Sequence, residues 1–401
     1  MTPAFYSSNI TNLVMAPSRS AVRWALVVAC VLFGLSRNPP QEMSHGRVLQ
    51  EERLRYYCNG EVSVSADEIE VGCASNVTVR PMEMGVVVQL YNHADQAEGV
   101  VRGLVNQKPV RRILVTDDGS TDGSMEAYRK ALNASARRNQ NIITNVIRTP
   151  NVHEIRNYNR GMELMMKENP SIELFALMQD DDVLQDDENN DRWAERAVEL
   201  FQRFPRLCVL GGYIGFEHIH NGLLRGFEYH GNEKSYNHKP SIEISQNCSG
   251  LQFQFVMSVA SSPMILRKQC VQDIGLLSEM YTQPGDPGIL FDVEYSLRAW
   301  ASRSWQVGIY RTEFHHGVGG HGTLSSREKR KQRQAANVKG QKWIREQHRG
   351  GGHLHCYYRP RLDREHRQQI MSEYRQNKNQ PQQHLATAVP KPNNNQTQSK
   401  Q

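Results

Sequence analysis

Two clusters of aspartates stand where apolar runs of the sequence end. One is Asp180, Asp181 and Asp182, just after Leu174–Met178, and the other is Asp117 and Asp118, just after Val110–Thr116. Carboxylates this close together repel one another and lose hydration unless a cation lies between them. Mg²⁺ and Mn²⁺ take carboxylate oxygens together with phosphate oxygens of a substrate, so a divalent cation is the simplest partner. The alternative is a solvated acidic loop that only caps a strand.

The apolar runs themselves predict buried strands, because they lack the polar alternation of a half-exposed strand. Helical segments separate them, which predicts a parallel sheet with right-handed crossovers. The loops after Leu90, Thr116 and Met178 should then share one edge, with Asp118 and Asp182 at strand ends in a ligand-binding position. Asp182 is expected to be exposed there. The expected strands are Val86–Leu90, Val110–Thr116, Ile142–Ile147 and Leu174–Met178, and the expected helices are Asp95–Val105, one through Tyr128 and Leu132 capped by Asp122 or Ser120, and Ile155–Lys167.

The second half of the chain predicts further elements of both kinds. Glu217–Cys248, rich in Gly, His and Asn, is expected to be an insertion or acceptor loop. After about Arg359 the composition turns to Gln, Asn, Lys and Arg, which predicts a disordered tail. The other expected elements are the helices Trp193–Phe204, Lys268–Ile274 and Leu290–Ala301, the strands Leu207–Phe216 and Gln306–Tyr310, and a strand or strand pair over Phe253–Leu266.

The amino terminus has the pattern of a secretory signal. Arg19 and Arg23 precede Ala25–Leu35, an apolar run without charge. The run is short for a spanning helix, so three alternatives stay open. They are an uncleaved signal-anchor, a signal cleaved near Ser36, and a transit peptide or no targeting at all. We adopt the signal-anchor, which predicts a single-pass type II protein of the Golgi or endoplasmic reticulum membrane with a luminal catalytic domain.

Composition is compatible with a large globular domain. The 401 residues are 38% hydrophobic, enough for one large α/β domain with flanking pieces. The formal net charge of +6 comes largely from local basic clusters, so no nucleic-acid partner is expected. Six cysteines outside the apolar run could pair in an oxidising lumen, for example Cys58 with Cys73 in a stem. Sequons at Asn76, Asn133 and Asn247 would be available for glycosylation there, which predicts a glycoprotein.

Four motifs follow one another along the chain. They are Val86-Val-Val-Gln-Leu-Tyr-Asn92, Leu114-Val-Thr-Asp-Asp-Gly-Ser-Thr-Asp-Gly-Ser124, Asn157 with Asn159-Arg160-Gly161, and Met178-Gln-Asp-Asp-Asp-Val-Leu184. Their order and approximate spacing are those of family 2 glycosyltransferases, and the chain resembles that family from about Val86 to His316. The resemblance implies the α/β GT-A fold, a Rossmann-like, mostly parallel sheet with flanking helices that forms one nucleotide-sugar domain with a metal-binding Asp-x-Asp.

Matching positions imply the donor site. Asp117 and Asp118 would hold the base and ribose of the nucleotide. Asp180 and Asp182 would fill the Asp-x-Asp, with Asp182 binding Mn²⁺ or Mg²⁺ most directly. Donor contacts are also implied for Tyr91, Asn92, Asn157, Arg160 and Asp181, and helix surface is the alternative for Asn157 and Arg160.

The downstream half resembles the family less closely. Phe291-Asp292-Val-Glu294 looks like the segment that supplies the catalytic base, although Phe291 stands where a Glu is expected. Asp292 is the implied base and Glu294 the second choice, the alternative being an acidic first turn favoured by the helix dipole. His316 is an implied metal ligand or else polar surface. Gly317–Gly322 would be a mobile loop, and Arg327, Lys329 and Arg330 would either close on a diphosphate or form a solvated helix face.

The combined prediction is a metal-dependent, inverting hexosyltransferase that moves a sugar from a nucleoside-diphosphate sugar to a glycan, protein or lipid hydroxyl. Glu217–Cys248 and Gln283–Gly288 are expected to select the acceptor. One rival is a nucleotidyltransferase, although the Gly-rich basic loop usual there is missing; the other is a binding protein that has lost its chemistry, which Phe291 favours. The predicted regions are a cytosolic tail (1–20), a signal-anchor (21–36), a stem (37–84), the GT-A domain (85–325), a basic extension (326–358) and a disordered tail (359–401).

Overall fold

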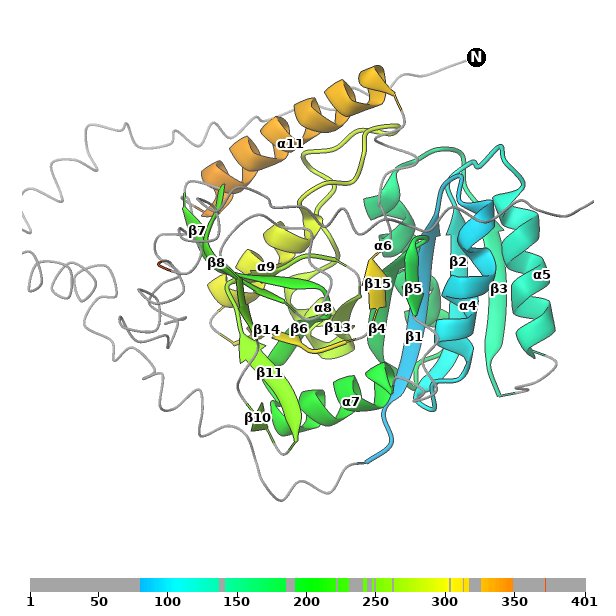
Figure 1. The fold of residues 1–401 in the computed structure, drawn as a ribbon, viewed down its shortest axis with the longest axis horizontal. Coiled ribbons are helices and arrows are strands. Elements are labelled where there is room, and N and C mark those ends of the chain that lie inside the picture. Colours follow the sequence, from blue (N-terminus) through cyan, green and yellow to red (C-terminus); the bar gives the residue numbers. More distant parts are fainter. Residues whose placement is uncertain are drawn as a thin grey trace, which may run out of the picture. The chain divides into compact units, whose positions relative to one another are not determined.

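The computed structural model describes residues 80–136, 141–184, 192–220, 223–230, 241–243, 247–248, 250–261, 263–302, 304–312, 314–316, 326–348 and 372 (Figure 1). The predicted signal-anchor, nearly all of the stem with Cys58, Cys73 and Asn76, the Gly317–Gly322 loop and the tail beyond Arg359 apart from Ser372 lie outside these residues. Among the described helices, none is long and apolar enough to cross a membrane.

A nine-stranded, mostly parallel sheet organises the described domain, in the order β10-β11-β14-β6-β13-β4-β1-β2-β3. β1 (Glu83–Leu90) lies between β2 (Val110–Asp117) and β4 (Ile172–Gln179) and is parallel to both. β3 (Ile143–Arg148) continues the parallel order beside β2. β13 (Met264–Arg267) is antiparallel to its neighbours β4 and β6 (Leu207–Gly211). The predicted α/β class and the parallel order of the first four strands are confirmed.

The remaining strands extend this sheet and form two smaller ones. β14 (Gln306–Tyr310) lies parallel to β6, followed by β11 (Leu251–Phe255) and β10 (Asn247–Cys248). A four-stranded sheet has the order β12 (Ser258–Val259), β7 (Ile214–His220), β8 (Leu223–His230) and β9 (Ser241–Glu243). β5 (Asp182–Leu184) pairs with β15 (Phe314–His316).

Two sequence predictions in this region are wrong. Glu217–Cys248 is not simply a loop, because it holds part of β7 and the strands β8, β9 and β10; its Gly, His and Asn content hid strand formers such as Phe227 and Tyr229. Leu207–Phe216 is also not one strand, because the strand is interrupted between β6 and β7, and these two strands belong to different sheets. A methyl group on Gly212 would lie 2.6 Å from Pro263, so the break depends on a glycine at that position.

Helices fall close to their predicted positions. They are η1 (Ala94–Gln96), α4 (Ala97–Val105), α5 (Ser124–Ala136), α6 (Glu154–Glu168), α7 (Trp193–Arg203), α8 (Lys268–Ile274), α9 (Phe291–Ala301) and α11 (Arg327–His348). Asp122 accepts a hydrogen bond of 3.0 Å from the backbone N–H of Ser124 at the start of α5, whereas Ser120 binds the backbone of Asn92 instead. α6 packs closely on β1, since a methyl group on Gly161 would lie 2.5 Å from Val87.

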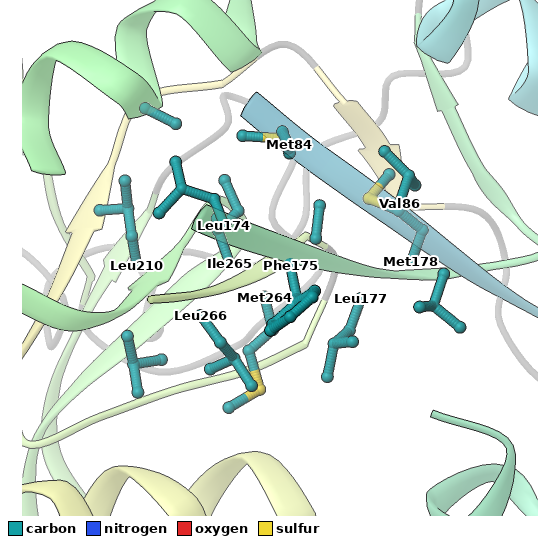
Figure 2. Close-up of a cluster of buried hydrophobic side chains, with 14 of the residues drawn as sticks. Met84, Val86, Leu174, Phe175, Leu177, Met178, Leu210, Met264, Ile265 and Leu266 are labelled. Carbon is teal, nitrogen blue, oxygen red and sulfur yellow. The ribbon is translucent and has the colours of Figure 1, made fainter. Parts of the chain in front are cut away.

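The core is centred on β4 and its neighbours (Figure 2). Phe175 and Leu177 of β4 and Met264 of the neighbouring β13 are fully buried there, and β1 lies on the other side of β4. Each such side chain contributes about 1.5–3 kcal/mol to folding by leaving water. A disulfide between Cys208 on β6 and Cys270 on α8 adds a covalent link inside this core. A rigid, continuous core therefore supports the strand ends where the acidic clusters lie.

Candidate active site

The two acidic clusters meet at one edge of the sheet. Leu90 pairs with Asp117 and Gln89 with Gln179 in the parallel registers of β1 with β2 and β4. The carboxyl ends of three adjacent strands therefore coincide, and Asp118 and Asp180 follow two of them. The prediction that the loops after these strands share one edge is confirmed.

A cavity of about 510 Å³ opens at this edge. Its volume is within the range of about 300–1,000 Å³ typical of small-molecule sites. Its wall is mostly polar and comes from six separate stretches of the chain. The lining residues are Gln89, Tyr91, His93, Asp118, Asn151, His153, Glu154, Gln179, Asp180, Asp181, Gly285, Asp286, Pro287, Gly288, Lys329, Gln332 and Arg333.

Asp118 lines the cavity and also holds the loop before α6. Its Oδ1 accepts a 2.7 Å hydrogen bond from the backbone N–H of Val152, and its Oδ2 accepts one of 3.2 Å from His153. His153 has φ of 87°, in a region that non-glycine residues seldom adopt. The carboxylate thus stabilises an unusual backbone conformation beside the cavity, as is common at functional sites.

Four other predicted donor contacts lie behind or outside the cavity lining. Asp117 is fully buried, and its Oδ1 accepts a 3.1 Å hydrogen bond from Ser120 while Oδ2 lies 3.5 Å from Arg148 Nε. Asn92, at φ of 57°, binds the same turn. Asn157 is fully buried, and its Oδ1 accepts a hydrogen bond from Thr149. Arg160 is exposed on α6.

Asp180 is held from two sides. Its Oδ2 accepts a 2.6 Å hydrogen bond from the backbone N–H of Tyr91, and its Oδ1 lies 2.9 Å from His93 Nδ1. Burial raises the pKa of the Asp180 carboxyl, and the contact with His93 opposes that rise. Burial alone would lower the pKa of His93, but the hydrogen bond and charge of Asp180 outweigh it and the net shift is upward. His93 therefore favours the charged carboxylate at the cavity wall.

Asp181 and Asp182 differ in environment. Asp181 lines the cavity, whereas Asp182 is fully buried and its Oδ2 accepts a 2.8 Å hydrogen bond from the backbone N–H of Gln179. The expectation of an exposed Asp182 is wrong, because this carboxylate closes the turn that follows β4. Asp182 also pairs in backbone register with His316, so two of the three predicted metal ligands come from adjacent strands.

The donor set fits a hard divalent cation that needs further ligands. In the described part of the chain, no three His, Cys, Asp or Glu side chains form a ready-made metal site. Asp180 and Asp181 nevertheless present carboxylate oxygens to the cavity. Mg²⁺ and Mn²⁺ commonly bind through one or two carboxylates and complete their coordination with substrate phosphates and water. The arrangement therefore fits a cation that binds together with a phosphorylated ligand.

The two candidate bases lie at the start of α9, outside the cavity lining. Asp292 is partly buried, and its Oδ2 accepts a 2.9 Å hydrogen bond from the backbone N–H of Ser261. Burial raises its pKa, which makes its carboxylate a stronger base. Glu294 is almost fully buried between Arg298, at 2.9 Å, and His348, at 3.6 Å. Phe291 is buried against Tyr158.

Sequence reasoning missed several cavity residues, above all Glu154. Its Oε1 accepts a hydrogen bond from Gln179, and a methyl group on Gly288 would lie 2.8 Å from its Cβ. Burial raises the pKa of Glu154 to about 8, the hydrogen bond from Gln179 opposes the rise, and the charge of Asp180 adds to it. An acidic residue in the first turn of a helix is ordinary, so the sequence held no signal that Glu154 faces a cavity.

The carboxyl-terminal part of the domain also reaches the cavity. Residues 285–288 line it, whereas none of Glu217–Cys248, the other segment predicted to select the acceptor, is among its described lining. Lys329 and Arg333, from the basic run, line it too, while Arg327 and Arg330 are exposed outside the lining. The Lys329 ammonium lies 5.5 Å from the centroid of the Tyr91 ring.

One protein family and several solved structures are similar to this chain. The family described as "Glycosyl transferase family 2" matches residues 85–259. No curated protein gives a significant match. Among solved structures, mannosyltransferase PcManGT from Pyrobaculum calidifontis in complex with GDP-Man and Mn²⁺ is 12% identical, with 87% of this chain and 84% of that chain covered and a TM-score of 0.39.

A second solved structure is similar at the same level. It is glucosyl-3-phosphoglycerate synthase from Mycobacterium tuberculosis in complex with Mn²⁺, UDP and glucosyl-3-phosphoglycerate, 12% identical, covering 68% of this chain and 83% of that chain, with a TM-score of 0.38. Because both TM-scores lie below 0.5, we draw no conclusion about this chain from these two structures.

Proposed function

We propose that the protein transfers a sugar from a nucleoside-diphosphate sugar to an acceptor hydroxyl, because residues 85–259 match glycosyl transferase family 2. The described domain has an α/β GT-A-like fold with a mostly parallel central sheet. The observation that carries the proposal is the convergence of Asp118, Asp180 and Asp181 on one cavity at the carboxyl edge of that sheet. Three carboxylates from separate strand ends suit a site that binds a cation with a phosphorylated ligand.

We assign donor binding to the three loops that follow β1, β2 and β4. Tyr91, Asp118 and Asp180 line the cavity from these three loops, so the donor would contact all of them. Asp117, Asn92 and Asn157 would support the site from behind by fixing the loops. Mn²⁺ or Mg²⁺ would be held by Asp180 with Asp181, or by Asp180 with Asp182 and His316. When bound, it would offset the negative charge that develops on the departing diphosphate.

Asp292 is proposed as the general base, with inversion at the anomeric carbon. Its carboxylate takes the proton of the acceptor hydroxyl while that oxygen bonds to the anomeric carbon. The bond from this carbon to the diphosphate oxygen breaks, and its electron pair leaves with the nucleoside diphosphate. Asp292 suits this role better than Glu294, because Arg298 and His348 already surround the Glu294 carboxylate.

The second candidate function is nucleotide-sugar or glycan binding without transfer. Phe291 favours it, because a buried aromatic ring stands where the family resemblance places a Glu. Neither Asp292 nor Glu294 lines the cavity of the described structure. The two candidates differ in one measurable property, the release of nucleotide from a sugar donor.

We also propose a luminal location, a membrane tether and a surface that contacts the acceptor. The buried disulfide Cys208–Cys270 supports an oxidising compartment, such as the lumen of the Golgi or endoplasmic reticulum. The sequon residue Asn133 is exposed on α5 and would accept a glycan there. A signal-anchor at 21–36 would tether the protein to the membrane. The acceptor, a glycan, protein or lipid, would contact the 285–288 segment.

The test is a panel of nucleotide sugars incubated with the purified protein, with and without Mn²⁺, followed by measurement of free nucleotide. A transferase releases nucleotide from at least one donor in a manner that depends on the metal and on Asp292. A thermal-shift panel of nucleoside diphosphates checks binding separately, since a ligand at about 100 times its Kd stabilises by about 2.7 kcal/mol. Binding without release would favour the second candidate, and the absence of both would overturn the proposal.

A further inference from the structure

The cavity carries a strong excess of acidic groups. Its lining includes the carboxyl groups of Asp118, Glu154, Asp180, Asp181 and Asp286. A diphosphate that enters such a site meets like charge at close range, and the repulsion is larger where water is excluded. One divalent cation offsets only part of it. The site therefore needs further positive groups to hold a diphosphate.

Among the described lining residues, Lys329 and Arg333 are the only lysine or arginine. They are four positions apart on α11, so they lie one above the other on one face of that helix, and Gln332 shares the face. The guanidinium of Arg333 lies close enough to Glu154 and Asp292 to oppose the upward pKa shifts that burial gives both carboxyls. The other basic residues of the run, such as Lys331, are exposed and outside the lining.

The second half of α11 anchors the helix on the domain. Ile344 is fully buried, and Trp343 packs on Tyr281 with ring centroids 5.1 Å apart. A methyl group on Gly340 would lie 3.2 Å from Leu290. His348 lies 3.6 Å from Glu294 on α9. These contacts orient the helix on the domain. Its first half therefore lies at the cavity although that half makes few apolar contacts of its own.

Together these observations assign a ligand-binding role to a helix that lies beyond the family-matched residues 85–259. We infer that α11 completes the donor site and that Lys329 and Arg333 bind the diphosphate of the nucleotide sugar. Lysine supplies a compact charge and arginine a planar fork for phosphate oxygens. The inference rests on the proposed function, since it takes the donor to be a nucleoside diphosphate sugar.

The experiment compares three forms of the full chain, namely wild type, the double variant Lys329→Gln/Arg333→Gln and the control Lys331→Gln. Isothermal titration measures the binding of UDP and GDP with Mn²⁺, and of uridine and guanosine, which lack phosphate. Glutamine has a helix propensity similar to that of lysine and arginine, so the helix should be kept while both positive charges are lost. We expect the double variant to lose at least about tenfold in nucleoside-diphosphate affinity, the size of one lost charge-assisted contact. The control and any nucleoside binding should not change.

Three further measurements distinguish a loss of binding from a loss of folding, and an effect of charge from an effect of side-chain shape. Thermal unfolding of the ligand-free double variant should remain a single transition close to that of wild type, because both side chains lie at the surface of the cavity and only the contact between Lys329 and the Tyr91 ring is lost. The conservative variant Lys329→Arg/Arg333→Lys should regain most of the affinity, and the salt dependence of UDP or GDP binding should be weaker in the Gln variant than in wild type.

The outcomes are distinct. Wild-type binding with equal affinity in the double variant would overturn the role of α11 and leave the proposed function intact. A loss of nucleoside binding equal to the loss of nucleoside-diphosphate binding would also overturn it, because the effect would then not involve the phosphates. Failure of wild type to bind any nucleoside diphosphate would defeat the proposed function, and the inference with it.

Discussion

The Lys329 ammonium lies 5.5 Å from the centroid of the Tyr91 ring, which joins α11 to the loop that follows β1. The backbone N–H of Tyr91 is in turn bound by Asp180. The loop after β1, an aspartate in the turn after β4 and a helix beyond the family-matched segment thus surround one cavity. A cation–π contact at an exposed site contributes about 0.5–1 kcal/mol, so the pair positions the lysine without holding it rigidly.

Replacing Asp181 tests the metal and donor site directly. We expect Asp181→Asn to weaken Mn²⁺-dependent binding of a nucleoside diphosphate by about tenfold or more, because one carboxylate that lines the cavity loses its charge. Thermal stability should be close to wild type. Titration of UDP and GDP at several Mn²⁺ concentrations measures the effect. An unchanged metal dependence would remove Asp181 from the ligand set.

Asp182 should behave differently, because it has a structural role. Asp182→Ala leaves the backbone N–H of Gln179 without its partner, so the free energy of unfolding should fall by about 1–3 kcal/mol. Asp182→Asn keeps an oxygen that can accept this hydrogen bond and should be nearly as stable as wild type. Chemical denaturation compares the two. Equal stability of wild type and Asp182→Ala would contradict the structural role, and loss of metal-dependent binding in the stable Asn variant would identify a metal ligand.

Substitutions of Asp292 and Glu294 should have different effects, one on sugar transfer and the other on stability. Asp292→Asn should retain donor binding and lose transfer, since an amide cannot take the acceptor proton. Glu294→Gln should lower the free energy of unfolding by about 1–3 kcal/mol, because the half-buried Arg298 loses its charged partner. Nucleotide release and thermal unfolding of both variants provide the comparison. Full transfer by Asp292→Asn would move the base to another residue.

Glu154 should make stability depend on pH. Its pKa is raised from about 4.5 when unfolded to about 8 when folded, so the folded state holds this proton more tightly. The stabilisation that the protonated Glu154 gives the folded state is fully present below the unfolded pKa. It is lost as the pH rises through the folded pKa. The free energy of unfolding of Glu154→Gln should therefore exceed that of wild type by about 1–2 kcal/mol at pH 8 and equal it at pH 4. The difference is limited because the Glu154 side chain is partly exposed. Denaturation of both proteins across this range measures the difference, and a difference that does not vary with pH would contradict it.

The disulfide between Cys208 and Cys270 should stabilise the domain. It closes a loop with a sequence separation of 62 residues inside the core. The double variant Cys208→Ala/Cys270→Ala should lose about 2–4 kcal/mol of unfolding free energy. Thermal unfolding with and without reductant checks this, because reduction should lower the stability of wild type and leave that of the variant unchanged. Equal sensitivity of both proteins to reductant would exclude this bond as the cause.

The sequence by itself determined the strands and helices of the first half and the edge where the acidic loops meet. Runs such as Leu174–Met178 are long and apolar enough to specify buried strands, and strand-helix alternation leaves few topologies open. It also located α8, whose bounds Lys268–Ile274 were predicted unchanged. These features depend on local pattern, which a single sequence carries.

Tertiary structure alone decided which side chains face the cavity. Asp181 and Asp182 are neighbours of identical chemistry, yet one lines the cavity and the other binds Gln179 behind it, because the turn after β4 rotates one carboxylate inward. Glu154 on α6 and Arg333 on α11 are 179 positions apart in sequence, and only the docking of α11 on α9 places both at the cavity. Orientation within a turn and packing between distant elements depend on the whole fold, so no local pattern could reveal them.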